Sequence, residues 1–310
     1  MSSLPVLPGI ISASVGTPGK AQNVPADVRY IQHLFNLITP ASRLVEDGKC
    51  GPLLVQRISD YQLKRLKVMK PDGVIDPGGR TFISLLDEAR AANPASPPPT
   101  ADTVWVAKPT CDGNVTLTEA DFQSAAAALG NGISVNLIKA FATVESGGRS
   151  GFGPAKLPVI AYEGHIFRKY TQQKYDKAYP FLSYPYLEKA GPQWKANNRD
   201  QATAWRTLAD AFRLDAEAAL MAASYGMFQV MGFNFGACGY TSVSDFVTAM
   251  KLNAGQQLIA FVGFCRKSPA LVKAMKNKDF AGMARNYNGA DYGDYDKRIQ
   301  KAFEALERKK

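Results

Sequence analysis

The stretch SVNLIKAFATVESGG, residues 134–148, predicts a helix that ends in a carboxylate. Its apolar residues recur at three- and four-residue spacing, which gives the helix one buried face, and the two glycines indicate where it stops. Glu145 therefore lies at the helix C-terminus, where backbone dipoles leave partial negative charge and hold the proton of a carboxyl group to higher pH. A general acid needs this property, so Glu145 is the candidate catalytic acid. The alternative is that Glu145 only ends a surface helix.

The composition is that of an ordinary globular protein. The 310 residues suffice for about two domains, and 46% of them are hydrophobic and 21% charged. The net charge of +10 indicates an anionic partner without distinguishing nucleic acid, membrane and cell wall. Apolar stretches fall far short of the roughly 20 residues of a membrane-spanning helix, and residues 1–11 lack the basic start of a secretory signal.

Cysteine and histidine usage argues against zinc chemistry and against a disulfide framework. The four cysteines are scattered without a CxxC pair, at Cys50, Cys111, Cys238 and Cys265. The two histidines, His33 and His165, lie in different predicted domains, which disfavours zinc amidases and zinc peptidases. We therefore expect no metal or organic cofactor.

A proline-rich segment divides the chain. Residues 93–110 contain five prolines among Ala, Ser and Thr, a composition that stays extended. We interpret them as a linker between a domain at 1–92 and a larger one at 111–310. The expected fold class is all-α, with a small three-helix domain joined to a larger helical domain.

The domain at 1–92 shows two matching units. Helical patterns at 27–38 and 55–66 carry Gln32 and Gln62, and each is followed by an Asp-Gly turn, at residues 47–48 and 72–73; a third helical pattern covers 80–91. This arrangement resembles the helical peptidoglycan-binding domain, and the resemblance implies that residues 1–92 bind the cell wall. The alternative is that these residues only fold a small helical domain.

The domain at 111–310 reads as nearly all helix, apart from an aromatic, proline-broken stretch between His165 and Trp194. The sequence TEAD at 118–121 predicts a helix start, and Gly130 its end. Further helices are expected at 198–212, 215–221, 245–251, 255–267, 270–275, 280–287 and 294–307.

Four ordered motifs carry the chemistry of this domain. ESGG at 145–148 is followed by ASYGMFQVM at 223–231, LNAGQQL at 252–258 and ARNYNG at 284–289. Their order and residue types resemble the goose-type lysozyme and lytic transglycosylase superfamily. YEGHIF at 162–167 adds a second carboxylate, Glu163, as in phage and bacterial N-acetylmuramidases that carry a peptidoglycan-binding domain.

The resemblance implies a site and a reaction. Glu145 would protonate the leaving oxygen of a β-1,4 bond between N-acetylmuramic acid and N-acetylglucosamine, and Glu163 would be a base, a substrate ligand or a structural ion-pair partner. Substrate contacts are expected from residues that could equally pack the core or shape turns: Ser146, His165, Tyr225, Gly226, Phe228, Gln229, Tyr287 and Asn288.

Alternatives remain within this interpretation. A lytic transglycosylase would use one Glu and form a 1,6-anhydro sugar, and a non-catalytic wall-binding or phage structural protein would carry a vestigial Glu145. A nucleic-acid binder rests only on positive charge and lacks a helix-turn-helix signature, so nucleic acid is not an expected partner.

The expected partner is peptidoglycan, and the expected state is a monomer. Wall binding without a signal peptide is similar to a phage endolysin, made in the host cytoplasm and reaching the wall after holin-type release; a secretion-system effector would show the same features. Basic residues near the C-terminus predict a solvated helix face or contact with anionic outer-membrane lipid: Lys297, Arg298, Lys301, Arg308, Lys309 and Lys310.

Overall fold

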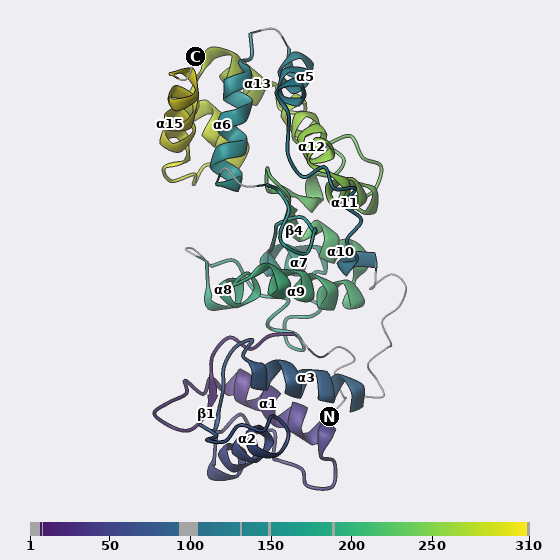
Figure 1. Ribbon diagram of the computed structural model, residues 1–310, viewed down its shortest axis with the longest axis vertical. Coiled ribbons are helices and arrows are strands. Elements are labelled where there is room, and N and C mark those ends of the chain that lie inside the picture. The colour runs from purple at the N-terminus through teal and green to yellow at the C-terminus, as the bar shows by residue number, and fades with distance from the viewer. Residues whose placement is uncertain are drawn as a thin grey trace. The chain divides into compact units, whose positions relative to one another are not determined.

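A computed structural model of the protein describes residues 7, 9–92, 105–130, 132–147, 150–187 and 190–308. Most of these residues form helices and only short sheets are present, which confirms the predicted all-α class (Figure 1). The chain forms two compact units, one made of residues 1–106 and 162–216 and the other of residues 107–161 and 217–310. Most of the predicted linker, residues 93–104, lies outside the described residues, and domains bounded at 92 and 111 stay a prediction.

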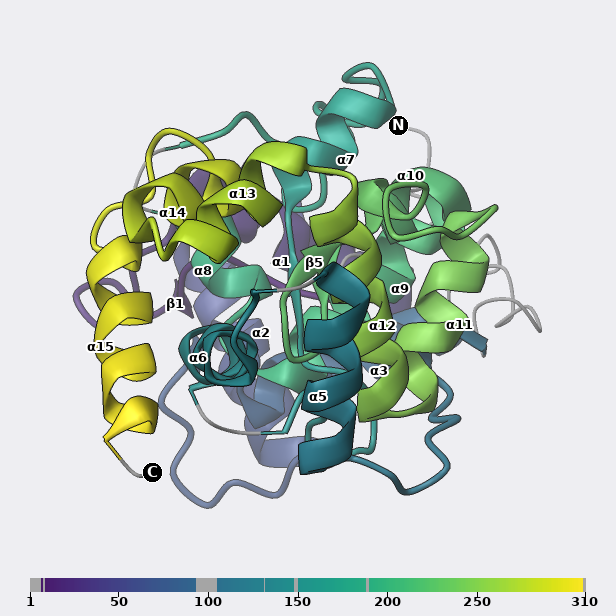
Figure 2. The same ribbon diagram turned by 90° about the horizontal axis from the view of Figure 1, so that it is seen from above.

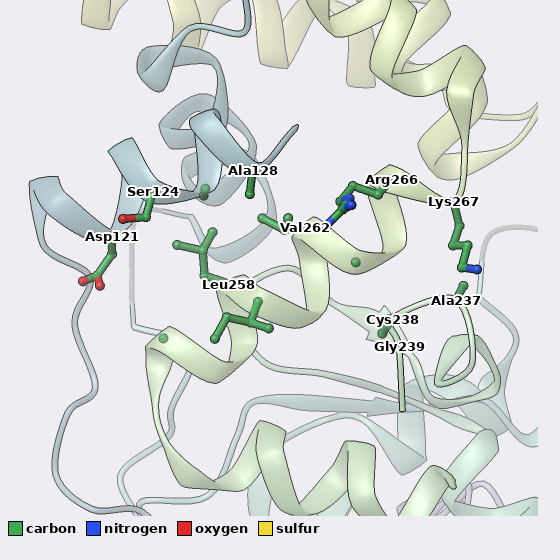
Figure 3. A pocket seen from close by; sticks show the side chains of 14 residues that line it. Asp121, Ser124, Ala128, Ala237, Cys238, Gly239, Leu258, Val262, Arg266 and Lys267 are labelled. Atoms are coloured by element: carbon green, nitrogen blue, oxygen red, sulfur yellow. The ribbon is translucent and has the colours of Figure 1, made fainter. Parts of the chain in front are cut away.

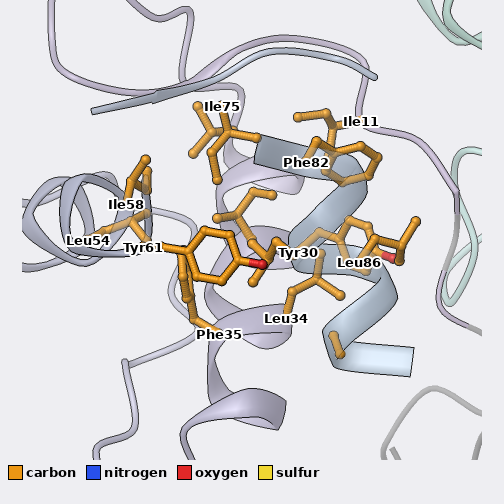
Figure 4. Packing of buried hydrophobic residues seen from close by; sticks show 14 of the residues in the cluster. Ile11, Tyr30, Leu34, Phe35, Leu54, Ile58, Tyr61, Ile75, Phe82 and Leu86 are labelled. Carbon is orange, nitrogen blue, oxygen red and sulfur yellow. The ribbon is translucent and has the colours of Figure 1, made fainter. Parts of the chain in front are cut away.

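The first unit begins with a small helical module. Its helices are α1 (Pro25–Ile38), α2 (Pro52–Lys64) and α3 (Arg80–Ala92), and β1 (Val15–Gly16) pairs antiparallel with β2 (Val74–Ile75). Proline occupies the first turn of α1 and α2, where the missing N–H costs nothing. The apolar faces of all three helices close over one core, in which Phe35 packs edge-on against Tyr61 and Phe82 is fully buried (Figure 4). This unit also contains α7 (Gly164–Tyr170), α8 (Pro192–Asn197) and α9 (Gln201–Leu214).

The two matching units of the sequence fold with matching hydrogen bonds. Gln32 donates to Asp47 Oδ1 at 2.9 Å and its Oε1 accepts from Gly48 N at 3.0 Å. Gln62 donates to Asp72 Oδ1 at 2.7 Å, and its Oε1 accepts from Gly73 N at 3.0 Å. Each buried glutamine thus holds the Asp-Gly turn that follows its own helix. This module therefore repeats one helix–turn unit, and the paired residues serve the fold.

A buried carboxylate joins α9 to this module. Asp210 is 1% exposed, and both of its oxygens accept from the Arg90 guanidinium of α3 at 2.9 Å. Arg213 donates to the same carboxylate at 2.9 Å, and Gly9 approaches so closely that a Cβ there would lie 2.9 Å from Asp210 Oδ2. Burial of a carboxylate requires such partners, so this contact fixes α3 against α9.

The second unit is a helical bundle with a small sheet. Helix α6 (Val135–Ser146) packs against α15 (Tyr295–Glu307), and α5 (Glu119–Leu129) packs against α12 (Ala254–Arg266) (Figure 2). The other elements are α10 (Ala216–Met221), η1 (Gly232–Asn234), α11 (Val243–Leu252), α13 (Pro269–Asn277) and α14 (Phe280–Asn288). The sheet has the order β3 (Ile160–Tyr162), β4 (Ala223–Tyr225) and β5 (Val230–Met231).

Local signals position the helix that carries Glu145. The Ser134 side chain caps α6 by accepting from Asn136 N, and Gly147 ends it in a left-handed conformation with φ of 62°. Thr118 and Asp121 form the predicted capping box of α5, and Gly130 ends that helix.

The aromatic stretch between His165 and Trp194 differs from the irregular segment that the sequence predicts, because it begins in α7 and ends in α8.

Candidate active site

Glu145 lies in the last turn of α6, and its carboxylate faces the start of α15. The Tyr295 hydroxyl donates to Glu145 Oε1, and the Arg298 guanidinium donates to the Val144 carbonyl at 3.0 Å. Burial raises the pKa of Glu145 to about 7, although the Tyr295 hydrogen bond and the Arg298 charge both lower it. The raised pKa expected from the sequence is thus present, but burial is its main cause and not the helix dipole. The group can hold a proton near neutral pH.

Aromatic rings pack behind this carboxylate. Tyr287, on α14, stacks on Tyr295 with ring centroids 6.1 Å apart and planes 8° apart, and Phe141 of α6 meets both rings edge-on. The Tyr287 hydroxyl donates to the Phe228 carbonyl at 2.7 Å, so α14 is tied to the loop between β4 and β5. Tyr295 itself is 4% exposed. Its hydroxyl is therefore held in one place, which orients the Glu145 carboxyl group.

The end of β4 and the loop that joins it to β5 carry four of the residues that the sequence singled out. Tyr225 is fully buried and donates to the Leu220 carbonyl at 3.0 Å, and Phe228 is fully buried and stacks on Phe261 with centroids 4.3 Å apart. In this structure both side chains pack the core, which supports the packing alternative. Their contact with substrate stays a prediction.

Gly226 and Gln229 shape this loop. Gly226 has a φ of 73°, and a Cβ there would lie 2.5 Å from the Gln257 amide, whose Oε1 accepts from Met227 N at 2.7 Å. The Gln229 amide donates to the Gly226 carbonyl at 2.8 Å and accepts from Ser224 Oγ at 2.8 Å. Gln229 has a φ of 45°, and its side chain is half-buried. Both polar ends of its amide therefore already have partners within the protein.

Ser146 and Asn288 lie at two helix ends of the same unit. Ser146 donates to the Ala142 carbonyl at 2.6 Å, within α6. Asn288 is the exposed last residue of α14, and Gly289 follows it with a φ of 91°. The exposed amide of Asn288 is open to a ligand, whereas the Ser146 hydroxyl is used by the helix. Gly148, the last residue of the ESGG motif, lies outside the described residues.

Glu163 and His165 belong to the other compact unit. Glu163 precedes α7, and its Oε1 accepts from the Trp194 indole nitrogen at 2.8 Å. The other oxygen lies 3.4 Å from His165 Nδ1, and the His165 ring meets Tyr186 edge-on. The site residues predicted from the sequence therefore form two groups, one around Glu145 and one around Glu163.

A large pocket of the second unit involves neither group. Its volume is about 710 Å³, and it lies between α5 and α12, lined by Leu258, Val262 and Arg266 among others (Figure 3). A smaller pocket of about 190 Å³ lies beside Glu163 and includes His165 in its lining. Polar and aromatic side chains converge on the smaller pocket, among them Glu163, His165 and Trp194.

Two residues around these groups escaped the sequence interpretation. Tyr295 lies beyond the ARNYNG motif, but it begins the buried face that continues at Ile299 and Phe303 with four-residue spacing, and this periodicity was visible. Trp194 stood in the aromatic stretch without an assigned partner. Its pairing with Glu163 joins positions 31 residues apart, for which the sequence carries no local signal.

Two further properties of the described residues bear on function. Within the described ranges, every helix is too short or too polar to span a bilayer. Those same ranges bring together no group of three or more His, Cys, Asp and Glu side chains suited to a metal ion.

Comparison with known proteins identifies the family. The N-acetylmuramidase family matches residues 134–307, which include Glu145, Glu163 and all four motifs. The crystal structure of the Burkholderia AP3 phage endolysin is similar, with 30% sequence identity and a TM-score of 0.53, over 91% of this chain and 96% of that one. No curated protein matches the chain. The chain belongs to the N-acetylmuramidase family, and it is a lysozyme-type glycoside hydrolase that acts on peptidoglycan.

Proposed function

We propose that this muramidase cleaves the β-1,4 bond between N-acetylmuramic acid and N-acetylglucosamine with Glu145 as the general acid. The observation that carries the proposal is the half-buried carboxyl group with a pKa raised to about 7, held by the Tyr295 hydroxyl. A protonated Glu145 donates its proton to the glycosidic oxygen as the bond to C1 breaks and an oxocarbenium-like centre forms. Water then adds to C1 and gives a reducing N-acetylmuramic acid end.

The role of the second carboxylate, Glu163, distinguishes hydrolysis by water from attack by the sugar's own hydroxyl. A hydrolase that inverts configuration needs a base for the attacking water, and Glu163 is the carboxylate that the sequence offers. Glu163 already accepts from Trp194 and lies near His165 Nδ1. These contacts favour a second candidate function, a lytic transglycosylase with one catalytic Glu, in which the sugar's own hydroxyl attacks and a 1,6-anhydro product forms.

The test is a digest of purified peptidoglycan with the wild type, Glu145→Gln and the control Glu304→Gln. Glu304 is exposed on α15 and tests whether loss of a carboxylate in this unit matters by itself. We expect reducing N-acetylmuramic acid ends from the wild type and the control alone, measured by mass spectrometry. Unchanged activity of Glu145→Gln would overturn the proposed role of Glu145, and products lighter by one water would identify a transglycosylase.

We also propose that residues 1–92 bind the wall and that residues 111–310 form the catalytic domain. The repeated Gln and Asp-Gly units support the resemblance of residues 1–92 to a peptidoglycan-binding domain. A monomer that acts as an endolysin, released to the wall through a membrane lesion, agrees with the similarity to a phage endolysin.

The basic residues of the C-terminal helix differ in what their side chains contact. Lys297, Lys301 and Arg308 are exposed on or just beyond α15 and are available to anionic lipid. Arg298 also donates to the end of α6, so it serves the candidate site. Lys309 and Lys310 lie outside the described residues.

A further inference from the structure

The pocket beside Glu163 has the features of a sugar subsite. It is lined by side chains of α7, α8 and the segment between them, including Glu163, His165, Tyr184, Tyr186, Gln193 and Trp194. Its volume of about 190 Å³ corresponds to about six water molecules at roughly 30 Å³ each. The pocket therefore has room for one compact group and not for a disaccharide.

Gln193 supplies a polar atom that lacks a partner. Its Oε1 is buried and accepts no hydrogen bond from the described residues. A buried acceptor without a donor costs free energy, and such groups are uncommon in native proteins. Because Gln193 lines the pocket, a ligand with an N–H or O–H group satisfies this atom on binding.

The aromatic side chains around the pocket contact other residues that line it. Trp194 uses its indole N–H on Glu163, at 2.8 Å, so the ring faces are what it can offer to a ligand. Tyr186 is 64% exposed and meets the His165 ring at 5.1 Å. Gly164 allows the close approach of Tyr184, because a Cβ there would lie 2.1 Å from that ring. The pocket thus presents flat apolar surfaces next to one unpaired acceptor.

We propose that this pocket binds the acetamido group of one N-acetylhexosamine residue of the glycan. The acetamido N–H donates to Gln193 Oε1, and the methyl group and sugar ring lie against Trp194 and Tyr186. An acetamido group fits because it combines a single N–H donor with a small apolar group. The inference rests on the proposed function, because the glycan supplies the ligand.

The same contacts assign a role to Glu163. Both of its oxygens lie within 3.4 Å of ring nitrogens, of Trp194 on one side and His165 on the other. In the proposed pocket, Glu163 thus contacts the Trp194 and His165 rings that line it.

The test measures binding of tri-N-acetylchitotriose in the full chain that carries Glu145→Gln, in which turnover is not expected. We expect saturable binding by calorimetry with a change in tryptophan fluorescence that disappears in the additional Trp194→Phe variant. Gln193→Met should weaken binding about five- to tenfold, because one neutral hydrogen bond is lost. The matched control Gln56→Met, at an exposed position of α2, should bind like the parent.

Cellotriose, which lacks acetamido groups, should bind at least tenfold more weakly. Equal affinity for the two sugars, or for the parent and Gln193→Met, would overturn the inference, as would absence of chitotriose binding. Gln193→Ala and thermal unfolding show whether the effect comes from folding. Binding is measured without cleavage, so the result for the pocket is separate from the result for Glu145. Chitotriose binding can be absent even if digestion requires Glu145. It can also be present even if digestion does not require Glu145.

Discussion

Glu145 sets the expected dependence of activity on pH. A general acid works only in its protonated form, and burial raises the pKa of this carboxyl group to about 7. We expect kcat/KM on purified peptidoglycan to be insensitive to the ionisation of Glu145 below about pH 6 and to fall about tenfold per pH unit above pH 8. Activity that rises between pH 7 and pH 9 at constant ionic strength would contradict this assignment.

Tyr295 tunes this group through its hydrogen bond. The bond lowers the pKa of Glu145, so Tyr295→Phe should move the alkaline limb of the pH profile upward by about one unit. Activity at pH 6 should fall about tenfold, because the carboxyl group is no longer oriented. Tyr240→Phe is the control, since the buried Tyr240 hydroxyl has no partner within the described ranges. Superimposable pH profiles for Tyr295→Phe and wild type would show that the hydrogen bond has no catalytic part.

Individual contacts were the part of the site that the sequence could not provide. Glu145 was visible because a helix and its glycine end are encoded locally, within about fifteen residues. Its partner Tyr295 lies 150 positions away, and nothing in either segment specifies the pairing. The sequence also could not decide whether Tyr225 and Phe228 are buried, because aromatic residues suit both a core and a sugar-binding surface.

Helices could be predicted because their signals are local in the sequence, whereas contacts join distant residues. Capping residues, glycine ends and apolar periodicity are local signals, and the expected helix at 80–91 corresponds to α3, Arg80–Ala92. Helices α7 and α8 have only 7 and 6 residues, too few for a clear apolar periodicity. The prolines and aromatic residues of this region therefore predicted only an irregular stretch. The pairing of β1 with β2 also joins distant segments, residues 15–16 and 74–75.

The repeated helix–turn unit predicts the effect of removing a glutamine. Gln62 is 4% exposed and holds the turn through Asp72, Gly73 and Val74. Gln62→Leu leaves these buried groups without partners and should lower the free energy of unfolding by about 3 kcal/mol. Urea unfolding followed by circular dichroism measures the loss. Gln56→Leu, at an exposed position of the same helix, should change stability by less than about 0.5 kcal/mol, and equal losses would refute this role of Gln62.

The contact between Arg90 and Asp210 makes the N-terminal module part of a larger compact unit. Arg90→Met removes the guanidinium that donates to both oxygens of the buried Asp210 carboxylate and leaves Arg213 and the Gly9 backbone N–H as donors. This loss should destabilise the unit by about 3–5 kcal/mol. Differential scanning calorimetry should then show a lower or split transition. Arg65→Met is the control, because its 3.7 Å pair with Glu88 is exposed and worth at most about 1 kcal/mol. Identical thermograms for the two variants would show that the buried pair does not hold α3 to α9.

The spacing of that pair along the chain has a consequence for synthesis. Arg90 leaves the ribosome 120 residues before Asp210. At about 5–20 residues per second, the finished N-terminal helices wait about 6–24 s for α9. During this interval the guanidinium and the surface around it face water or a chaperone, so the nascent module must hold together through its own core and its two glutamine-held turns.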